Sequence, residues 1–409
     1  MVVTKLGINF ITHVKVLRFI LCTVCLLWSY AHAGEALKEL YKLPSSALLL
    51  VDASQRPLIS KQKDRLFTPA STIKLVTALA ALERWGRNHR FSTEFYLHSQ
   101  SNALIVKGLG DPFLISEELD VIAGEIKRLG VERLAKIIVD GSYFESKVNL
   151  SNQSKTNNPY HALASALAVN FNTIEVEVTE KGIISAEAQT PLTPLAKSLA
   201  QGLPIGRQRI NLGYSEHSSR YFVELLSAKL RKIGIWVGES NDDENNIQAI
   251  DVSNTKQLFI HANTRTLAQV VSAMLEYSNN FIANQLFLLL GVERYGPPAS
   301  LDKSQRMLRR YLDQQFVWDE YTIEDGSGLS RLNQLSAKQL IDVLTNFAPY
   351  RDLMPQQSPK ILAKSGTLKG VSCYAGYLHR EDEWQAFAML INQPVPYRFR
   401  ERLAEELLR

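Results

Sequence analysis

The alternation of apolar and polar positions predicts a hairpin and then a buried helix near the start of the chain. Apolar runs at residues 46–51 and 57–59 flank a short polar segment, which is typical of a β-hairpin. After Pro69, residues 75–82 are almost wholly apolar, and Gly86 ends the run. Proline in the first turn and glycine just past the end favour a helix to about residue 85, buried under a sheet.

Residues 87–213 have a different pattern of apolar and polar positions, with short alternating apolar runs broken by Gly, Asn and Pro. Such runs predict strands rather than helices. The predicted strands cover residues 91–97, 103–106, 135–139, 173–178 and 208–212. This stretch is therefore expected to form an inserted, strand-rich second domain.

Helical periodicity returns in the second half of the chain. The acidic, Asn-rich residues 239–246 are expected to form a solvated loop. The predicted helices cover residues 221–233, 266–290, 301–316, 336–347 and 398–409, and the predicted strands cover 360–363, 371–378 and 384–391. Strands near both ends with helices between them indicate that the two ends meet in one sheet, which the insert interrupts.

The first 33 residues carry the pattern of an export signal. Lys5, Lys15 and Arg18 precede an apolar run at residues 19–28, no acidic residue is present, and Ala31-His32-Ala33 follows. This pattern predicts a secretory signal peptide that is cleaved near Ala33. A membrane anchor is the alternative, but about 10 apolar residues are fewer than the roughly 20 that a span needs. We expect an exported, periplasmic protein without stable membrane insertion.

Composition and charge are those of a globular protein. The 409 residues are 45% hydrophobic and 21% charged. The formal net charge is +5 and becomes smaller when the signal is removed, because the signal carries three basic residues and no acidic ones. No nucleic-acid partner is therefore expected. Of three cysteines, only Cys373 lies beyond the predicted signal. The exported protein would therefore fold without disulfides and rely on its core.

Ser71 and Lys74 form a candidate nucleophile and base. Positions three apart are neighbours on a helix surface, so the hydroxyl and the amine would share one face. A serine needs a neighbouring group to take its proton, and a lysine can do so only where its neutral form is favoured, for example beside a second cation. The pair alone is a weak signal, since an exposed lysine near a helix-start serine is common.

Two further segments supply the remaining groups of such a site. Ser278-Asn279-Asn280 lies inside a predicted helix, where Ser278 could relay a proton to the leaving amine and Asn280 could donate to the substrate's amide oxygen. Lys364 begins a second segment at a predicted strand and would be the second cation. Each segment alone also fits a structural role, a helix-capping cluster or a turn.

The residues after Lys364 fit a substrate that ends in a carboxylate. Ser365 and Thr367 offer hydroxyls to that carboxylate, and Gly366 would let the substrate approach the strand backbone. The amide of Thr367 could complete an oxyanion hole with the amide of Ser71.

The three motifs, in this order, resemble those of penicillin-binding proteins and serine β-lactamases. With three further segments, the chain resembles the class C low-molecular-mass penicillin-binding proteins, which are D-alanyl-D-alanine carboxypeptidases and endopeptidases. These segments are Gly108-Leu109-Gly110-Asp111-Pro112, Asp140-Gly141-Ser142-Tyr143-Phe144 and Asp325-Gly326-Ser327-Gly328-Leu329-Ser330-Arg331. The third motif has Ser365 where threonine is commoner, and Asn279 is a second departure.

The resemblance implies an α+β fold, with an α/β/α transpeptidase domain around a central antiparallel sheet. That catalytic domain would comprise residues 34–86 and 214–409, with residues 87–213 inserted and a further small domain reduced or absent. The resemblance also implies action on peptidoglycan stem peptides and covalent acylation of Ser71 by β-lactam antibiotics. Asp140 is our candidate for receiving the free end of the peptide's diamino acid.

Two other functions remain open. A serine β-lactamase would use a similar site but needs a group that holds a deacylating water, and no motif supplies one. A catalytically silent wall-binding or scaffold protein could keep the fold without the reaction. No cofactor or metal is expected, because His89, His161, His261 and His379 lack ligand spacing. The balance between carboxypeptidase and endopeptidase activity stays open.

Overall fold

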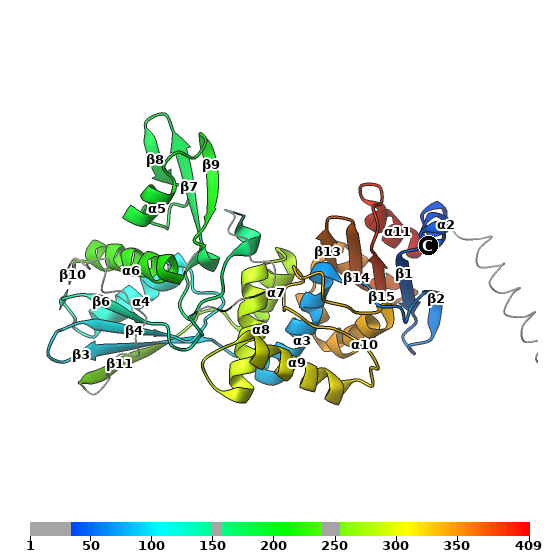
Figure 1. Ribbon diagram of the computed structural model, residues 1–409, viewed down its shortest axis with the longest axis horizontal. Helices are drawn as coiled ribbons and strands as arrows, with labels where there is room; N and C mark the ends of the chain where they lie inside the picture. The colour runs from blue at the N-terminus through cyan, green and yellow to red at the C-terminus, as the bar shows by residue number, and fades with distance from the viewer. Residues whose placement is uncertain (1–33, 147, 149, 151–157, 214, 239–253) are drawn as a thin grey trace, which may run out of the picture.

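The computed structural model describes residues 34–146, 148, 150, 158–213, 215–238 and 254–409 (Figure 1). The predicted signal peptide and the predicted acidic loop at residues 239–246 lie outside these residues. Among the described helices, none is long and apolar enough to cross a membrane.

The catalytic part is built on a six-stranded antiparallel sheet in the order β12-β13-β14-β15-β1-β2. Its strands are β1 (Ser46–Val51), β2 (Pro57–Lys61), β12 (Gln356–Ser358), β13 (Ile361–Leu368), β14 (Val371–Arg380) and β15 (Glu383–Ile391). Ser46 of β1 pairs with Ile391 of β15, so the two ends of the chain meet in one sheet as the sequence predicts.

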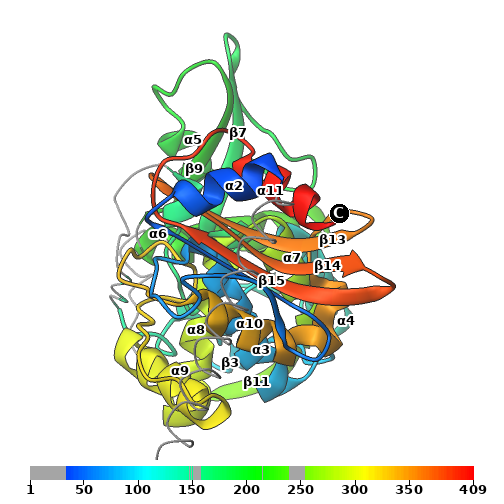
Figure 2. The ribbon, with the colours of Figure 1, turned by 90° about the vertical axis from the view of Figure 1, so that its right-hand side faces the viewer.

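Helices cover both faces of this sheet (Figure 2). The terminal helices α2 (Glu35–Lys42) and α11 (Phe399–Leu407) pack on one face around Leu40 and Leu403. The opposite face packs against a larger core that includes α3 (Lys74–Trp85), α7 (Leu267–Glu276), α8 (Asn280–Tyr295), α9 (Leu301–Gln315) and α10 (Ala337–Phe347), and the short η5 (Ala348–Leu353) lies at its edge. The predicted α/β/α arrangement is confirmed.

The inserted part carries a mixed four-stranded sheet, β11-β3-β4-β6, and a two-stranded parallel ladder of β10 and β5. The helices α4 and α6 belong to the same hydrophobic cluster. The bounds are β3 (Ser92–His98), β4 (Leu104–Gly108), α4 (Ser116–Arg128), β5 (Arg133–Leu134), β6 (Ile137–Asp140), α6 (Ser215–Lys232), β10 (Trp236–Val237) and β11 (Thr255–Ala262).

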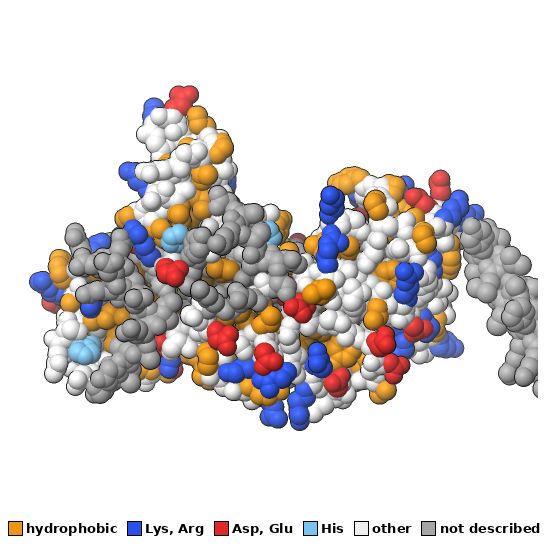
Figure 3. All heavy atoms as spheres, viewed as in Figure 1, with side chains coloured by type: hydrophobic (Ala, Val, Ile, Leu, Met, Phe, Trp, Pro, Cys, Tyr) orange, Lys and Arg blue, Asp and Glu red, His pale blue; other side chains and the backbone are white. Residues whose placement is uncertain are grey.

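A further small sheet, β8-β7-β9, projects from this unit with the short helix α5. Its bounds are β7 (Thr173–Thr179), β8 (Gly182–Ser185), α5 (Pro194–Leu199) and β9 (Gly206–Asn211), and the single turns η2 (Pro159–His161) and η3 (Asn170–Asn172) precede it. We expected a further small domain to be reduced or absent, and this three-stranded sheet with one short helix is the small unit that the structure contains; its strands β7 and β9 overlap the predicted strands at residues 173–178 and 208–212. In Figure 3 it stands apart from the catalytic part across an open notch.

The packing places the end of the second domain later than the expected residue 213. Strand β11 pairs with β3, and the apolar side chains of α6, such as Phe222 and Leu226, are buried in the core of the insert. Sequence periodicity identifies a helix but not the sheet on which it packs. We therefore propose a boundary after Ala262.

The predicted helix at residues 266–290 is two helices. Ser278 has a left-handed φ of 51°, which interrupts the helix after α7. The side chain of Asn279 then accepts a hydrogen bond from the amide of Ile282 at 3.0 Å and caps the start of α8. The prediction of a continuous helix was wrong because a polar turn can sit between two apolar helical runs without disturbing their period.

Candidate active site

Ser71 lies in a single turn of 3₁₀ helix, η1 (Ala70–Ile73), which leads directly into α3. The sequence predicts a helix start here, and the structure places a tighter turn at that position. Ala70 has a left-handed φ of 47°, and Ser71 is half-buried. The amides at the start of such a turn have no partner within the helix, so they remain available to an oxyanion.

Lys74 has no solvent exposure, and its Nζ has three oxygen neighbours. It lies 3.1 Å from Ser71 Oγ and donates to Asn280 Oδ1 at 2.7 Å and to the carbonyl of Ser327 at 2.5 Å. Burial lowers the pKa of Lys74 well below its usual 10.5, and the nearby positive charge of Lys364 lowers it further, while Asp325 opposes both effects. The neutral amine that a general base requires is thus favoured.

The second motif lies in the turn between α7 and α8. Ser278 Oγ accepts a hydrogen bond from Lys364 Nζ at 2.9 Å. Asn280 holds Lys74 through its Oδ1 and donates from Nδ2 to the carbonyl of Tyr160 at 3.1 Å. An amide NH₂ has two hydrogens, so Nδ2 keeps one for a substrate oxygen.

Lys364 on β13 is the second buried lysine of the site, with 1% of its surface exposed. Its Nζ donates to Ser278 Oγ and to the carbonyl of Ser365 at 2.8 Å. Burial lowers the pKa of Lys364 to about 7, with a further contribution from the positive charge of Arg400 and an opposing one from Glu276. The second motif thus lies between the two lysines, with Lys364 on Ser278 and Lys74 on Asn280.

Gly366 is required by the packing of the protein itself. A Cβ on Gly366 would lie 2.8 Å from the carbonyl oxygen of Pro69 and 3.0 Å from the amide nitrogen of Ser71. From the sequence, we expected this glycine to allow the close approach of the substrate. The structure shows that the missing side chain also lets η1 pack directly against β13. Ser365 is half-buried beside it, and Thr367 is exposed.

The loop at residues 325–331 has a role that the sequence motif alone did not reveal. The buried carboxylate of Asp325 accepts hydrogen bonds from the amides of Ser327 at 2.9 Å, Gly328 at 2.5 Å and Ser330 at 2.7 Å. A Cβ on Gly328 would lie 2.1 Å from the carbonyl oxygen of Ala70. The loop thus wraps around Asp325, packs on η1 and presents the Ser327 carbonyl to Lys74.

Arg400 is a second group that the sequence did not indicate. It lies in α11, and its Nη1 donates to Thr367 Oγ1 at 2.7 Å and to the carbonyl of Gly366 at 3.1 Å. Nothing in the local pattern around residue 400 distinguishes this arginine from its neighbours. Only the fold brings the C-terminal helix to the end of β13.

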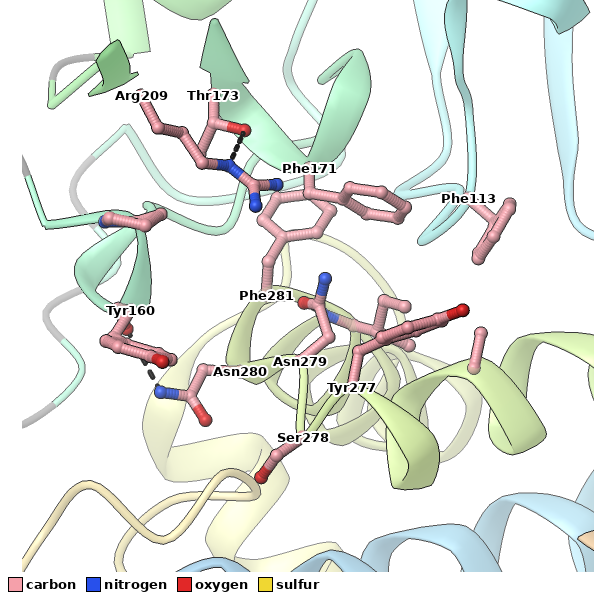
Figure 4. Close-up of a pocket in the computed structure, with 13 residues that line it drawn as sticks. Phe113, Tyr160, Phe171, Thr173, Arg209, Tyr277, Ser278, Asn279, Asn280 and Phe281 are labelled. Carbon is pink, nitrogen blue, oxygen red and sulfur yellow. Dashed lines mark hydrogen bonds between the residues drawn. The ribbon is translucent and has the colours of Figure 1, made fainter. Parts of the chain in front are cut away.

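Asp140 is not brought to the catalytic groups. It ends β6 in the inserted domain, and its Oδ1 accepts a hydrogen bond from the amide of Ser142 at 2.9 Å. The cavity beside Ser278 is lined instead by other side chains of the insert, including Arg209 (Figure 4). The role that the resemblance suggested for Asp140 stays a prediction.

In the parts of the chain that the structure describes, no group of three or more His, Cys, Asp or Glu side chains lies close enough together to hold an ion.

With this geometry in place, comparison with known proteins decides the family. A model of the D-Ala-D-Ala carboxypeptidase 3 (S13) family matches residues 41–201 and 207–358. The chain belongs to this family. It is a serine-type D-Ala-D-Ala carboxypeptidase, a hydrolase, and the family resemblance of the motifs is confirmed.

Relatives match along most of their length. A D-alanyl-D-alanine carboxypeptidase from an Actinomadura species is 26% identical over 88% of this chain and 81% of its own. The carboxypeptidase DacB of Haemophilus influenzae is 22% identical over 86% of each chain. The crystal structure of penicillin binding protein 4 from Haemophilus influenzae superimposes with a TM-score of 0.72 at 20% identity, covering 92% of this chain and 100% of that one.

The contact of Gly366 with η1 can be tested by Gly366→Ala. The added methyl group must push β13 away from the Ser71 amide, and this separates the two amides of the predicted oxyanion hole. We expect acylation by a penicillin to slow by at least about tenfold, because loss of one oxyanion donor costs about a hundredfold or more. Stopped-flow acylation rates measure the effect. Gly124→Ala is the control, since a Cβ there meets nothing within 4 Å, and equal rates for both variants would contradict the prediction.

The burial of Lys364 predicts a pH dependence of stability. At pH values between about 7, which is the pKa of Lys364 in the folded protein, and its usual 10.5, Lys364 is protonated in the unfolded chain and neutral in the folded protein. The free energy of unfolding should therefore rise with pH across this window, by at most about 1.4 kcal/mol per pH unit for one proton. Urea unfolding of Lys364→Met should show a flatter rise than the wild type between pH 7 and 10. The exposed Lys360→Met is the control and should keep the wild-type slope.

Proposed function

We propose that this protein hydrolyses the terminal D-Ala-D-Ala bond of peptidoglycan stem peptides through an acyl-enzyme on Ser71. The observation that carries the proposal is the fully buried Lys74 amine, 3.1 Å from the Ser71 hydroxyl and with its pKa lowered. A serine becomes a nucleophile when an adjacent base can take its proton, and this amine is the adjacent base.

In the acylation step, the Ser71 proton passes to Lys74 while Oγ attacks the carbonyl carbon of the penultimate D-alanine. The amides of Ser71 and Thr367 are the donors for the oxyanion. As the C–N bond breaks, Lys74 gives up the proton that it took from Ser71, and the Ser278 hydroxyl relays it to the leaving amine, so Lys74 is neutral again. The contact of Ser278 Oγ with the Lys364 amine holds the relay in place. In the second step, neutral Lys74 takes a proton from the water that attacks the ester and returns it to Ser71 Oγ as the ester bond breaks.

The carboxylate of the leaving D-alanine would bind at the end of β13. Ser365 and Thr367 supply hydroxyl groups there, and the guanidinium of Arg400 already donates to Thr367 Oγ1. A carboxylate in this position gains charge-assisted hydrogen bonds. The arrangement suits a substrate with a free C-terminal carboxylate, and this is the chemistry that a carboxypeptidase requires.

We also propose endopeptidase activity on peptide cross-links and covalent inhibition by β-lactams. A predatory peptidoglycan endopeptidase from Bdellovibrio bacteriovorus has a similar fold, with a TM-score of 0.53 at 15% identity over 89% of this chain. The Haemophilus influenzae penicillin binding protein 4 has been crystallised with a β-lactam. Figure 3 shows an open notch between the projecting sheet β8-β7-β9 and the catalytic part, and we propose that a second peptide strand lies there.

Two features bear on the cellular compartment of the protein: its proposed substrate and the pattern of its first 33 residues. A cell-wall substrate requires export, and the N-terminal pattern predicts a signal peptide cleaved near Ala33. We propose that the mature protein works in the periplasm.

The nucleophile and base can be tested with a fluorescent penicillin. The purified wild type should take up label, Ser71→Ala should take up none, and Lys74→Ala should acylate at least about a hundredfold more slowly, since general-base catalysis contributes about 10² to 10⁴. Lys338→Ala is the control, because this exposed lysine lies on the surface of α10 and pairs there with Asp342. Circular dichroism should show all variants folded.

The labelling experiment also separates the alternatives. An unlabelled wild type would favour the silent scaffold. Rapid, sustained hydrolysis of nitrocefin, at many turnovers per second, would favour the β-lactamase. A Lys74→Ala variant that acylates at the wild-type rate would contradict the mechanism while leaving the family intact.

The two peptidase activities can be separated with defined muropeptides. Purified protein is incubated with a monomeric pentapeptide muropeptide and with a cross-linked dimer, and the products are identified by mass spectrometry. We expect loss of one alanine from the first and cleavage of the second into monomers, both abolished in Ser71→Ala. Cleavage of the monomer alone would contradict the endopeptidase part of the proposal.

A further inference from the structure

A cavity of about 410 Å³ opens between the Ser278-Asn279-Asn280 turn and the inserted part of the chain (Figure 4). Its described lining contains five aromatic side chains and a single charged one, Arg209 on β9. Ser278 and Asn280 line the cavity and also contact the two catalytic lysines. The cavity is therefore continuous with the active site.

Aromatic rings form one wall of the cavity. The ring of Phe171 packs edge-on against Phe113, with centroids 5.2 Å apart, and against Phe281, with centroids 6.4 Å apart. Tyr160 and Tyr277 stand at the edges, with 58% and 77% of their surface exposed. The site thus offers apolar surface to a ligand that arrives from solvent.

The backbone that carries Phe171 is held in an unusual conformation. Asn170, Phe171 and Asn172 all have left-handed φ angles, of 53°, 59° and 58°. Bulky residues rarely adopt this region. Asn170 Oδ1 accepts from the amide of Ser116 at 2.9 Å, and Asn172 Nδ2 donates to the carbonyl of Leu163 at 2.9 Å. Partly buried hydrogen bonds therefore fix the segment that places the ring in the cavity.

Arg209 presents unused hydrogen-bond donors to this space. Its Nε donates to Thr173 Oγ1 at 3.4 Å and lies 4.0 Å from a carboxylate oxygen of Glu175. Glu175 pairs more closely with Arg207, at 2.5 Å. Among the described residues, no acceptor satisfies the terminal nitrogens of Arg209. Figure 4 shows the guanidinium directed toward the rings, into the cavity.

The chemistry of the lining favours an anion. The described lining contains no acidic side chain, so an amine would find no counter-charge. A guanidinium binds a carboxylate through paired, charge-assisted hydrogen bonds. The Arg209 side chain is 44% exposed, and a ligand that packs on the aromatic rings beside it would displace water from the pair and so strengthen the attraction between the two charges.

We propose that this cavity binds a carboxylate-bearing segment of the acyl-donor peptide, upstream of the D-alanyl residue that acylates Ser71. The inference rests on the proposed peptidase function. A peptide whose carbonyl lies at Ser71 and whose amide oxygen meets Asn280 continues past Tyr277 toward Arg209. The carboxylate of an acidic residue in that segment pairs with Arg209, and its aliphatic part packs on the rings.

Two synthetic peptides test this assignment. Both end in D-Ala-D-Ala and are identical except for one upstream residue, which carries a free carboxylate in the first peptide and the matching carboxamide in the second. We expect the wild type to show a kcat/KM for release of D-alanine about tenfold higher on the carboxylate peptide, as for one charged hydrogen bond. Arg209→Ala should reduce this preference to less than about twofold.

Arg207→Ala is the matched control. It removes the same charge from the same strand, next to the same Glu175, but residue 207 does not line the cavity. This variant should keep the tenfold preference. Thermal melts of both variants check that β9 remains folded.

Each other outcome contradicts a defined part of the proposal. Equal use of both peptides by the wild type, or a preference that survives Arg209→Ala, overturns the carboxylate site alone. Loss of the preference in both arginine variants assigns it to overall charge and also overturns the site. A wild type that takes up penicillin but cleaves neither peptide overturns the peptidase function, and this inference with it.

Sugar binding is distinguished by a third substrate. The carboxamide peptide is attached to a neutral disaccharide, which could stack on the exposed ring of Tyr277. A rise in kcat/KM from the sugar, abolished by Tyr277→Ala and without any preference for the carboxylate, would assign the cavity to the glycan and overturn our proposal.

Discussion

The burial of one lysine side chain constrains the rest of the active site. An amine with no solvent exposure loses its hydration and must find hydrogen-bond partners within the protein. Lys74 finds them on three segments far apart in sequence: the Ser71 hydroxyl, the Asn280 amide oxygen and the Ser327 carbonyl. Each segment must therefore be held in place by contacts of its own. The same burial lowers the pKa and makes the amine a base, so structural and chemical requirements coincide.

Helix α8 carries the connection between the catalytic and inserted parts. Its first residue, Asn280, binds Lys74 and the carbonyl of Tyr160. One turn and a half later, the buried Gln285 donates to the carbonyls of Gly110 and Ser165 and accepts from the Ser165 amide. The insert is thus anchored to the helix that starts at the active site. A displacement of the insert would move Asn280, and with it an acceptor of Lys74.

Much of the site could be predicted from the sequence because its chemistry lies in short segments. Ser71 and Lys74 are three residues apart, so one helical turn sets their geometry without knowledge of the fold. Asp325 and Arg400 could not be assigned roles in this way. The loop that Asp325 organises meets Lys74 and η1 only in the folded protein, and the contact of Arg400 with Thr367 is likewise set by tertiary packing. The break in the helix at Ser278 could not be predicted for a related reason. Apolar periodicity continues on both sides of it, and a left-handed φ does not change the order of apolar and polar residues. The packing of α6 on the insert was hidden as well, since periodicity shows an apolar face but not its partner.

The C-terminal helix completes the electrostatics of the site. Arg400 contributes to lowering the pKa of Lys364, and the charge of Lys364 in turn contributes to lowering that of Lys74. In this chain, each positive charge disfavours protonation of the next amine. A substrate carboxylate at Thr367 would offset the charge of Arg400, with which that hydroxyl is hydrogen-bonded. Protonation of Lys364 would then become easier, and its contact with Ser278 lies on the proposed proton path to the leaving amine. Substrate binding would in this way strengthen the hydrogen bond from Lys364 to Ser278 Oγ and leave the Ser278 hydroxyl hydrogen free for the leaving amine, while Lys74 remains the base beside Ser71.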